Sequence, residues 1–103
     1  MNVNHPENEQ SGALALPADL SMASARELRE MLSTALKAPA ELTVDASEVS
    51  RVSTATLQLL LAFRRARKAA GLSTRWGGIS GVLNESAGWL GLRQALELPV
   101  EGR

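Results

Sequence analysis

The sequence predicts an α/β domain with a mostly parallel or mixed β-sheet of about four strands and three to four α-helices packed on it. Two observations indicate this class: short apolar runs alternate with segments of helical periodicity, and the order along the chain is β-α-β-α-β-α. Strands that are separated by helices pair in parallel through right-handed crossovers. The chain has 103 residues, which is enough for one hydrophobic core but not for two separate folds.

The N-terminal part of the sequence predicts a tail, a strand and a helix. Residues 1–11 are polar and predict a flexible tail or a weak edge strand, and the domain then covers residues 12–103. A short apolar run at residues 13–16 predicts the first strand of this domain. Ser24 and Glu27 form a capping-box pattern, and the apolar residues that follow recur with the period of a helix.

The rest of the chain predicts two more strand–helix units. Residues 42–44 predict the second strand, and a Leu-rich helix that we expect to be buried on nearly every side begins at Ser53 or Thr54. Residues 72–76 predict the third strand, which a pair of glycines ends. A third helix follows over residues 80–90, before a short terminal element. Helices therefore separate the strands, which is the arrangement of a parallel sheet.

Composition and charge argue against several classes of protein. Eleven Lys and Arg residues balance eleven Asp and Glu residues, so the chain lacks the basic excess of a nucleic-acid-binding protein. It has no cysteine, and its one histidine, His5, lies in the polar N-terminal part, so thiolate and His-dependent sites are not expected. No apolar run approaches the ~20 residues of a membrane-spanning helix, and the N-terminus has no signal-peptide pattern. We therefore expect a cytoplasmic protein with no cofactor, no nucleic-acid partner and no direct insertion into a membrane.

The strongest candidate chemistry lies in the turn Ser53-Thr54-Ala55-Thr56. This turn places three hydroxyls at the start of a buried helix, beyond the carboxyl end of a strand, where open α/β sheets often meet their ligands. A helix N-terminus has unpaired N–H groups and a partial positive charge, so it stabilises an anion or a phosphate attached to its first residues. Ser and Thr are also the preferred N-caps of any helix, so a purely capping role stays open.

Other polar and aromatic residues favour structural roles. The basic helix end at residues 64–68 predicts solvated side chains, with an acidic-partner or nucleic-acid site as the alternative. Gly77 and Gly78 lack the pattern of a phosphate-binding loop and predict a turn. Trp76 and Trp89 predict packing in or near the core. The acidic residues are too scattered for a catalytic carboxylate pair: Asp19, Asp45, Glu48 and Glu85.

An aliphatic strand with an Asp at its end, a hydroxyl-rich turn and a Leu-rich helix follow one another from Leu42 to Leu61. This order resembles the central signature of STAS domains, the sulfate-transporter and anti-sigma-factor-antagonist modules. Residues 52–57 correspond to the strand-to-helix turn of that signature. The loop over residues 16–21 resembles the loop before the first helix of these domains, and residues 84–92 resemble their last helix. The resemblance implies a STAS-like fold and a non-enzymatic protein–protein interaction module.

The turn departs from the family pattern at the positions of its phosphorylation switch. The usual Asp of the turn is Ser53 here, and the serine that is phosphorylated in sporulation-type antagonists corresponds to Ala55, which has no hydroxyl. The neighbouring Gly of the family corresponds to Thr56. Thr54 matches the Ser or Thr that directly precedes the phosphorylated residue. The resemblance therefore makes Thr54 the best phospho-acceptor candidate, ahead of Ser53 and Thr56.

The resemblance implies a protein partner. A regulatory binder of the anti-sigma-factor-antagonist type would act in bacterial signalling, on a serine/threonine-kinase-type anti-sigma factor or a chemosensory component, with Thr54 as its switch. The alternative, which Ala55 favours, is a constitutive cytoplasmic accessory subunit of a lipid-transport ABC transporter, with the ABC ATPase as partner. A small-ligand binder that uses the helix N-terminus is a third reading. The resemblance places the partner-binding surface on Asp19, Ser21, Met22, Ser53, Thr54, Ala55, Thr56 and Gln58.

Overall fold

Three parallel strands form the main sheet, and β3 holds its central position. The protein is described by a computed structural model over residues 11–38 and 40–99. The strands of this sheet lie in the order β1-β3-β5. Their bounds are Ser11–Ala15 for β1, Glu41–Ala46 for β3 and Ser73–Ile79 for β5. All their pairings are parallel, so the predicted α/β class is confirmed.

A second, smaller sheet and the helices complete the described part of the fold. Two short parallel strands, β2 and β4, make this sheet and span Asp19–Leu20 and Arg51–Val52. A short 3-10 helix, η1, spans Met22–Ser24. The α-helices are Ala25–Ala35 (α2), Thr54–Ala69 (α3), Gly81–Trp89 (α4) and Arg93–Leu96 (α5).

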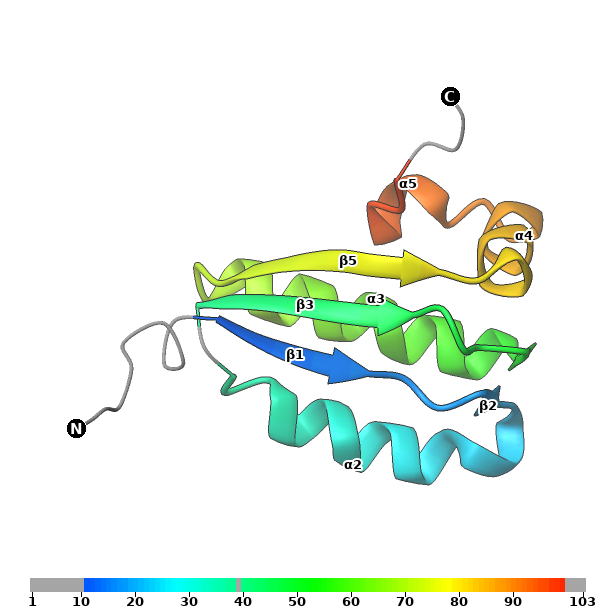
Figure 1. Cartoon of the computed structure of the whole chain (residues 1–103), viewed down its shortest axis with the longest axis horizontal. Coiled ribbons are helices and arrows are strands. Elements are labelled where there is room, and N and C mark those ends of the chain that lie inside the picture. Colours follow the sequence, from blue (N-terminus) through cyan, green and yellow to red (C-terminus); the bar gives the residue numbers. More distant parts are fainter. Residues whose placement is uncertain (1–10, 39, 100–103) are drawn as a thin grey trace.

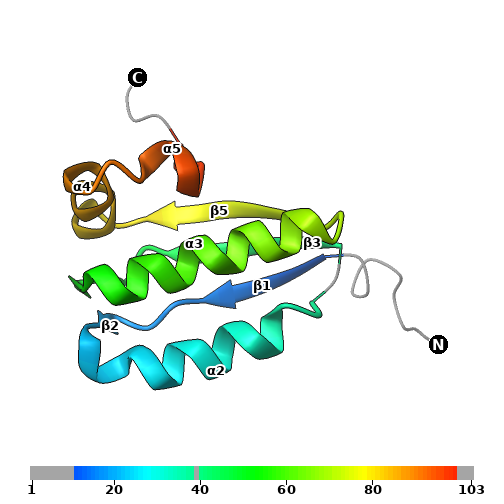
Figure 2. The ribbon, with the colours of Figure 1, turned by 180° about the vertical axis from the view of Figure 1, so that it is seen from behind.

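The helices α2 and α3 cover the same face of the main sheet. Figure 1 shows the three strands in front of α3, and Figure 2 shows α2 and α3 side by side from behind. Because the strands are parallel, the carboxyl ends of β1, β3 and β5 point toward the same end of the molecule. The strand β2, the start of α3 and the helix α4 gather at this end (Figure 1). This grouping places the hydroxyl-rich turn at the carboxyl edge of the sheet.

The core between the sheet and these helices is aliphatic, as the scarcity of aromatic residues predicts. Alternate residues of β3 face it, since successive side chains of a strand point to opposite faces. Nearly all the buried side chains are Leu, Val or Ala, and the single Phe of the chain is among them. The buried apolar residues of β3, α2 and α3 are Leu42, Val44, Ala46, Leu28, Leu32, Ala35, Leu57, Leu60, Leu61 and Phe63.

The helix α3 is amphipathic, which corrects the expectation that its first turns are buried on nearly every side. Its leucines 57, 60 and 61 face the core, but Thr54, Gln58 and Ala62 are exposed. The sheet covers only one side of α3, which packs along it, and α2 covers a second side. A polar stripe at the start of α3 therefore remains on the surface.

The glycine pair does not end the third strand, contrary to the sequence-based expectation. The strand β5 continues through Gly77 and Gly78 to Ile79. A Cβ at Gly77 would lie 3.0 Å from the Thr43 side chain, and one at Gly78 would lie 3.0 Å from Asp45 Oδ1. The register between β3 and β5 also shifts at this point. The glycines therefore allow a close approach of two strands at an irregular pairing, a role that glycine often has inside strands.

Two expectations for the N-terminal part also change. The strand β1 begins at Ser11, which makes Ser11 part of the sheet. The rest of the predicted tail, residues 1–10, lies outside the described residues. Ser24 precedes α2, but its side chain makes no capping hydrogen bond. Ser24 lies in η1 with φ −96° and ψ 2°, whereas a capping residue normally has extended backbone.

The basic end of α3 is not simply solvated, because Arg67 is fully buried. Its guanidinium donates to the carbonyls of Ala35 and Ala38 at 3.3 Å each, and to the carbonyl of Ser73 at 2.9 Å. Its Nε donates to Thr74 Oγ1 at 2.7 Å. Desolvation lowers the pKa of Arg67 below its ordinary value. Arg67 thus joins the end of α3 to the backbone carbonyls at the end of α2 and at the start of β5.

Candidate functional site

The turn before α3 is closed by a capping box between Ser53 and Thr56. Ser53 has extended backbone, with φ −119° and ψ 162°, and its Oγ accepts a hydrogen bond from the Thr56 N–H at 3.2 Å. In return, the Ser53 N–H donates to Thr56 Oγ1 at 3.1 Å. This reciprocal pair satisfies donors that the start of a helix would otherwise leave without a partner. The capping role that the sequence left open is therefore confirmed for Ser53.

Thr56 also ties the turn to β2. Its hydroxyl donates to the backbone carbonyl of Leu20 at 2.6 Å, and its side chain is fully buried. The Ser53 N–H approaches the same carbonyl at 3.1 Å. A buried hydroxyl with these partners is not accessible to a kinase or to another protein. The choice of Thr56 as a phospho-acceptor and partner contact is therefore corrected: its role is to hold the turn in place.

The loop after β1 closes against the same turn through the pairing of β2 with β4. Asp19 lies opposite Arg51 and Leu20 lies opposite Val52. The Asp19 carboxylate accepts a hydrogen bond from the Ser21 N–H at 2.9 Å. Hydrogen bonds from Ser21, and then the nearby charge of Arg51, lower the pKa of Asp19. The structure thus brings Asp19 and Ser21, two of the predicted partner-binding residues, into the strand–loop unit that supports the turn.

Several of the predicted partner-binding side chains are open to solvent at this end of the molecule. Met22 in η1 is 65% exposed, which is high for a large apolar residue. Thr54 and Gln58 are exposed on the first turns of α3, and Ala55 between them is half-buried. The polar groups beneath are already bonded to one another, so the exposed side chains stand on a rigid base.

Trp89 and Leu90 enlarge this surface, and the sequence analysis did not assign them to it. Trp89 at the end of α4 is 85% exposed, which corrects the expectation that it packs near the core, and Leu90 is 45% exposed. A shallow hollow of about 200 Å³ joins α4 to the turn. The hollow is lined by Val52, Ser53, Thr54, Leu57, Ser86, Trp89 and Leu90.

The position of Trp89 around the helix axis of α4 could have predicted its exposure to solvent. Leu83 and Ala87 are both fully buried and lie four residues apart, so they define the inner face of α4. At about 100° per residue, Trp89 lies about 200° around the helix from Ala87. It therefore points away from the core. Trp76, by contrast, packs against the core and donates from its ring nitrogen to the carbonyl of Leu96 at 2.9 Å, as expected for a near-core tryptophan.

The acidic residues at the carboxyl edge are separately bonded. The Asp45 carboxylate accepts a hydrogen bond from the Ser47 N–H at 2.9 Å, and hydrogen bonds from Ser47 lower its pKa. Over residues 11–38 and 40–99, no group of three or more His, Cys, Asp or Glu side chains is placed to hold a metal ion. Within the same ranges, no helix has the length and apolar character to cross a membrane. His5 lies outside the described residues.

Comparisons with known proteins agree with this architecture. The family model described as "Mlab, STAS domain" matches residues 3–98 of the chain. Among solved structures, a sulfate transporter family protein from Wolinella succinogenes superposes with a TM-score of 0.64, at 16% sequence identity, over 84% of this chain and 70% of that one. At this level of identity the likeness shows the fold alone. The comparison with curated proteins found no match.

Proposed function

This chain belongs to the STAS domain family, whose model matches residues 3–98, and from that premise we propose that it is a non-enzymatic protein–protein interaction module. STAS domains generally mediate such interactions. The proposed docking surface, called the turn surface below, consists of Met22, Thr54, Gln58, Trp89 and Leu90. Its position at the carboxyl edge of the sheet agrees with where open α/β folds usually bind.

The observation that carries this proposal is the exposure of Trp89 beside the turn. A tryptophan that is 85% exposed leaves a large apolar ring in water, and it lies next to the half-exposed Leu90. Exposed apolar clusters with polar neighbours mark interaction sites, and tryptophan is among the residues that dominate binding energies. The Ser53–Thr56 capping box keeps the adjoining turn rigid. A rigid surface with an aromatic anchor loses little conformational entropy on binding.

The turn favours constitutive binding over a phosphorylation switch. The Ser53 hydroxyl is bound in the capping box, Ala55 has no hydroxyl and Thr56 is buried. We therefore propose that the partner is a transport ATPase of the ABC class and that the chain is its accessory subunit in the cytoplasm. The Ala-rich chain with its Arg-rich helix end resembles the STAS subunit of a lipid-asymmetry transporter, in agreement with this partner class, and it also resembles stand-alone STAS proteins of chemosensory or two-component signalling.

Affinity capture from the native cell lysate tests this function. The wild-type chain and the Thr54→Ala and Thr54→Glu variants should all retain a transport ATPase, whereas Trp89→Ala should lose it. Leu36→Ala provides the matched control, because Leu36 is also an exposed apolar residue but lies at the C-terminal end of α2. Loss of the ATPase with both Trp89→Ala and Leu36→Ala, or with neither, would count against the turn surface.

One observation favours a second candidate, the switched regulatory binder. Thr54 is exposed and is the first residue of α3, where the partial positive charge of the helix end stabilises an attached phosphate. A phosphate there would add nearly two negative charges beside Trp89 and Leu90. The partner would then be a serine/threonine-kinase-type anti-sigma factor or a chemosensory component.

Intact-mass analysis separates this second candidate from the first. The chain is incubated with ATP and each kinase-type protein that it captures, and any added phosphate is located by peptide mapping. Phosphate on Thr54, together with release of the partner by Thr54→Glu, would support the switch. An unchanged mass, or phosphate elsewhere on the chain, would exclude it.

A further inference from the structure

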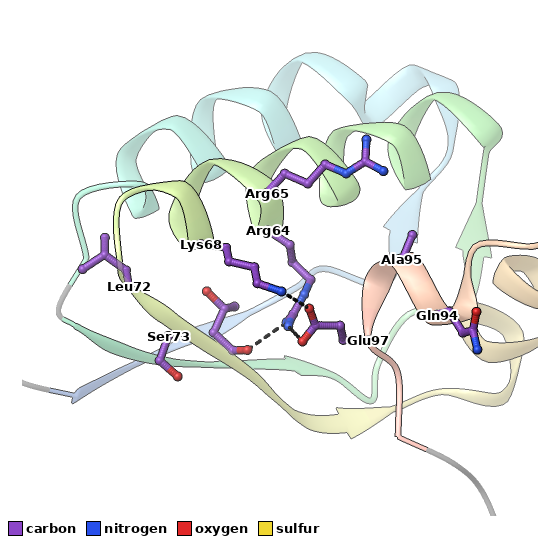
Figure 3. Close-up of a pocket in the computed structure, with 9 residues that line it drawn as sticks. Arg64, Arg65, Lys68, Leu72, Ser73, Gln94, Ala95 and Glu97 are labelled. Carbon is purple, nitrogen blue, oxygen red and sulfur yellow. Dashed lines mark hydrogen bonds and ion pairs between the residues drawn. The ribbon is translucent and has the colours of Figure 1, made fainter.

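A polar cavity lies on a different part of the molecule from the turn surface. It has a volume of about 470 Å³ and opens between the C-terminal half of α3, the start of β5 and the helix α5 (Figure 3). Figure 3 shows Arg64 and Lys68 pointing from α3 toward Glu97 at the end of α5. The residues that line the cavity are Arg64, Arg65, Lys68, Leu72, Ser73, Thr74, Gln94, Ala95 and Glu97.

One cation of the cavity wall is held firmly in place. The Arg64 side chain is only 11% exposed, and its guanidinium donates to the carbonyl of Thr74 at 2.9 Å and to Glu97 Oε1 at 2.8 Å. The same guanidinium lies 5.7 Å from the centre of the Trp76 ring. The second cation, Lys68, is 79% exposed and lies 3.4 Å from Glu97 Oε2. Arg64 is thus a preorganised anion-binding group, and Lys68 is free to adjust.

Glu97 acts as an internal anion in this cavity. Its backbone has φ 58° and ψ 41°, the left-handed conformation that residues other than glycine rarely adopt. Glu97 is the C-cap of α5, a position where helices commonly end in this conformation, and its N–H donates to the carbonyls of Arg93 and Gln94. The charge of Arg64 and then the contact with Lys68 lower the pKa of Glu97, so the carboxylate stays ionised at neutral pH. Arg64 and Lys68 thus already hold one anion, and a ligand at this position would compete with the Glu97 carboxylate.

The cavity has more positive charge than Glu97 neutralises. Arg64, Arg65 and Lys68 carry three positive charges against the one negative charge of Glu97, which leaves a surplus of two. Arg65 and Gln94 also line the cavity, and both residues are exposed.

We propose that this cavity binds a small soluble phosphate monoester. Such a group carries about −1.5 to −2 charges at neutral pH, which matches the surplus, whereas a single carboxylate would not. A guanidinium fork with an adjacent ammonium is the usual protein environment of a phosphate. The volume lies within the range of roughly 300–1,000 Å³ that small-molecule sites occupy. This site is separate from the turn surface and does not depend on the proposed docking function.

The lining of the cavity favours a soluble ligand over a lipid surface. A protein that binds a lipid headgroup at an interface usually adds exposed apolar side chains that enter the bilayer. The large exposed apolar residues of the described part do not line this cavity: Met22, Leu36, Val82, Trp89 and Leu90.

Titration of the full chain with glycerol 2-phosphate, followed by amide NMR shifts and calorimetry, tests the proposal. The proposal expects saturable shifts in residues 64–74 and 93–98, with salt weakening the binding. Dimethyl phosphate, which carries one charge, should bind at least about threefold more weakly. Arg65→Gln and Lys68→Gln should each weaken binding by roughly threefold to tenfold, while Lys37→Gln, which changes an exposed cation in the turn after α2, should have no effect.

The variant Glu97→Gln provides a result of the opposite sign. Removing the internal anion should tighten the binding of glycerol 2-phosphate by roughly threefold or more, because the ligand no longer competes with a carboxylate. Unsaturable shifts, or equal losses with Lys37→Gln and Lys68→Gln, would overturn the proposal. Binding to phosphatidic acid vesicles without binding to the soluble ester would overturn it as well. Arg65→Gln keeps the test decisive if Glu97→Gln unfolds, since Arg65 is exposed.

Discussion

Ser53 and Thr56 cap α3 reciprocally, each donating its backbone N–H to the hydroxyl oxygen of the other, at 3.1 and 3.2 Å. The Thr56 hydroxyl also reaches the carbonyl of Leu20 at 2.6 Å. Ser53→Ala should therefore lower the free energy of unfolding by about 1 kcal/mol, the usual value of an N-cap. Thr56→Val should cost about 1–2 kcal/mol, because it removes a buried hydroxyl that accepts from the Ser53 N–H and donates to the Leu20 carbonyl.

Urea denaturation followed by circular dichroism checks these two values against Thr54→Ala. Thr54 is exposed and belongs to neither half of the capping box, so its variant should stay within about 0.5 kcal/mol of the wild type. If Thr54→Ala is as costly as Thr56→Val, the stability of the turn does not depend on the capping box.

Arg67 should be the most sensitive of the basic residues at the end of α3. Arg67→Met would leave the carbonyls of Ala35, Ala38 and Ser73 without this buried donor, and each such group costs about 1–3 kcal/mol. We expect a loss of about 3 kcal/mol or more in the free energy of unfolding, measured by urea denaturation. Arg65→Met, on the exposed side of the same helix, should change it by less than about 0.5 kcal/mol. Equal effects of the two variants would refute the role assigned to Arg67.

The close approach of β5 to β3 predicts opposite outcomes for two glycines. Gly78→Ala would place a Cβ 3.0 Å from Asp45 Oδ1 and from the Ser47 side chain, so we expect a loss of about 1–3 kcal/mol. Gly81→Ala has open space around its Cβ and lies in the first turn of α4, so it should be neutral or stabilising by up to about 1 kcal/mol. Thermal unfolding of both variants decides the point: a destabilised Gly81→Ala beside an unaffected Gly78→Ala would contradict the structure.

The carboxyl group of Asp45 contributes to the dependence of the free energy of unfolding on pH in acid. Hydrogen bonds from Ser47 hold the pKa of Asp45 below its ordinary value of 3.8, so the folded state binds this proton less readily than the unfolded state does. Its contribution is therefore complete above about pH 4 and is lost as the pH falls through the lower, folded pKa. We call the fall of the free energy of unfolding from about pH 5 to about pH 2.5 the acid limb. Asp45→Asn should make this acid limb less steep, as measured by denaturation over that pH range.

The control for this pH dependence lies in the loop that follows β3. Glu48→Gln removes a carboxyl group but leaves the Asp45–Ser47 hydrogen bond intact. It should keep the acid limb that Asp45→Asn loses. An unchanged limb in Asp45→Asn would show that this carboxyl group does not contribute.

The order of the main-sheet strands and of the helices between them, and the position of the turn, could be predicted from the sequence, because they depend on local patterns. The two-residue strands β2 and β4 were not predicted. Apolar periodicity places α3 correctly from Thr54, and the Ser at its start is a true N-cap. The predicted end of the third strand was wrong, because Gly77 and Gly78 are required by the approach of β3, which is a tertiary effect. For the same reason the burial of Arg67 could not be predicted, because the local sequence does not indicate that backbone carbonyls at the end of α2 will surround its guanidinium.

The exposure of the residues in the candidate surface could be predicted only in part. Thr54, Gln58 and Met22 are exposed as a docking surface requires, but Thr56 is buried because its hydroxyl points to Leu20 on a strand far away in the sequence. Trp89 could have been recognised from its angular position relative to the apolar stripe of α4. Its closeness to the turn could not, since that depends on how α4 packs beside β4.

The most direct test of the docking function is the affinity of the purified chain for the transport ATPase that it captures, measured by calorimetry. Trp89→Ala should weaken the binding by roughly thirtyfold or more, as expected for a tryptophan that anchors an interface. Thr54→Glu should change the affinity by less than about threefold, because a rim charge in water contributes little. A Trp89→Ala variant that binds as tightly as the wild type would contradict the turn surface, and a Thr54→Glu variant that no longer binds would contradict constitutive docking.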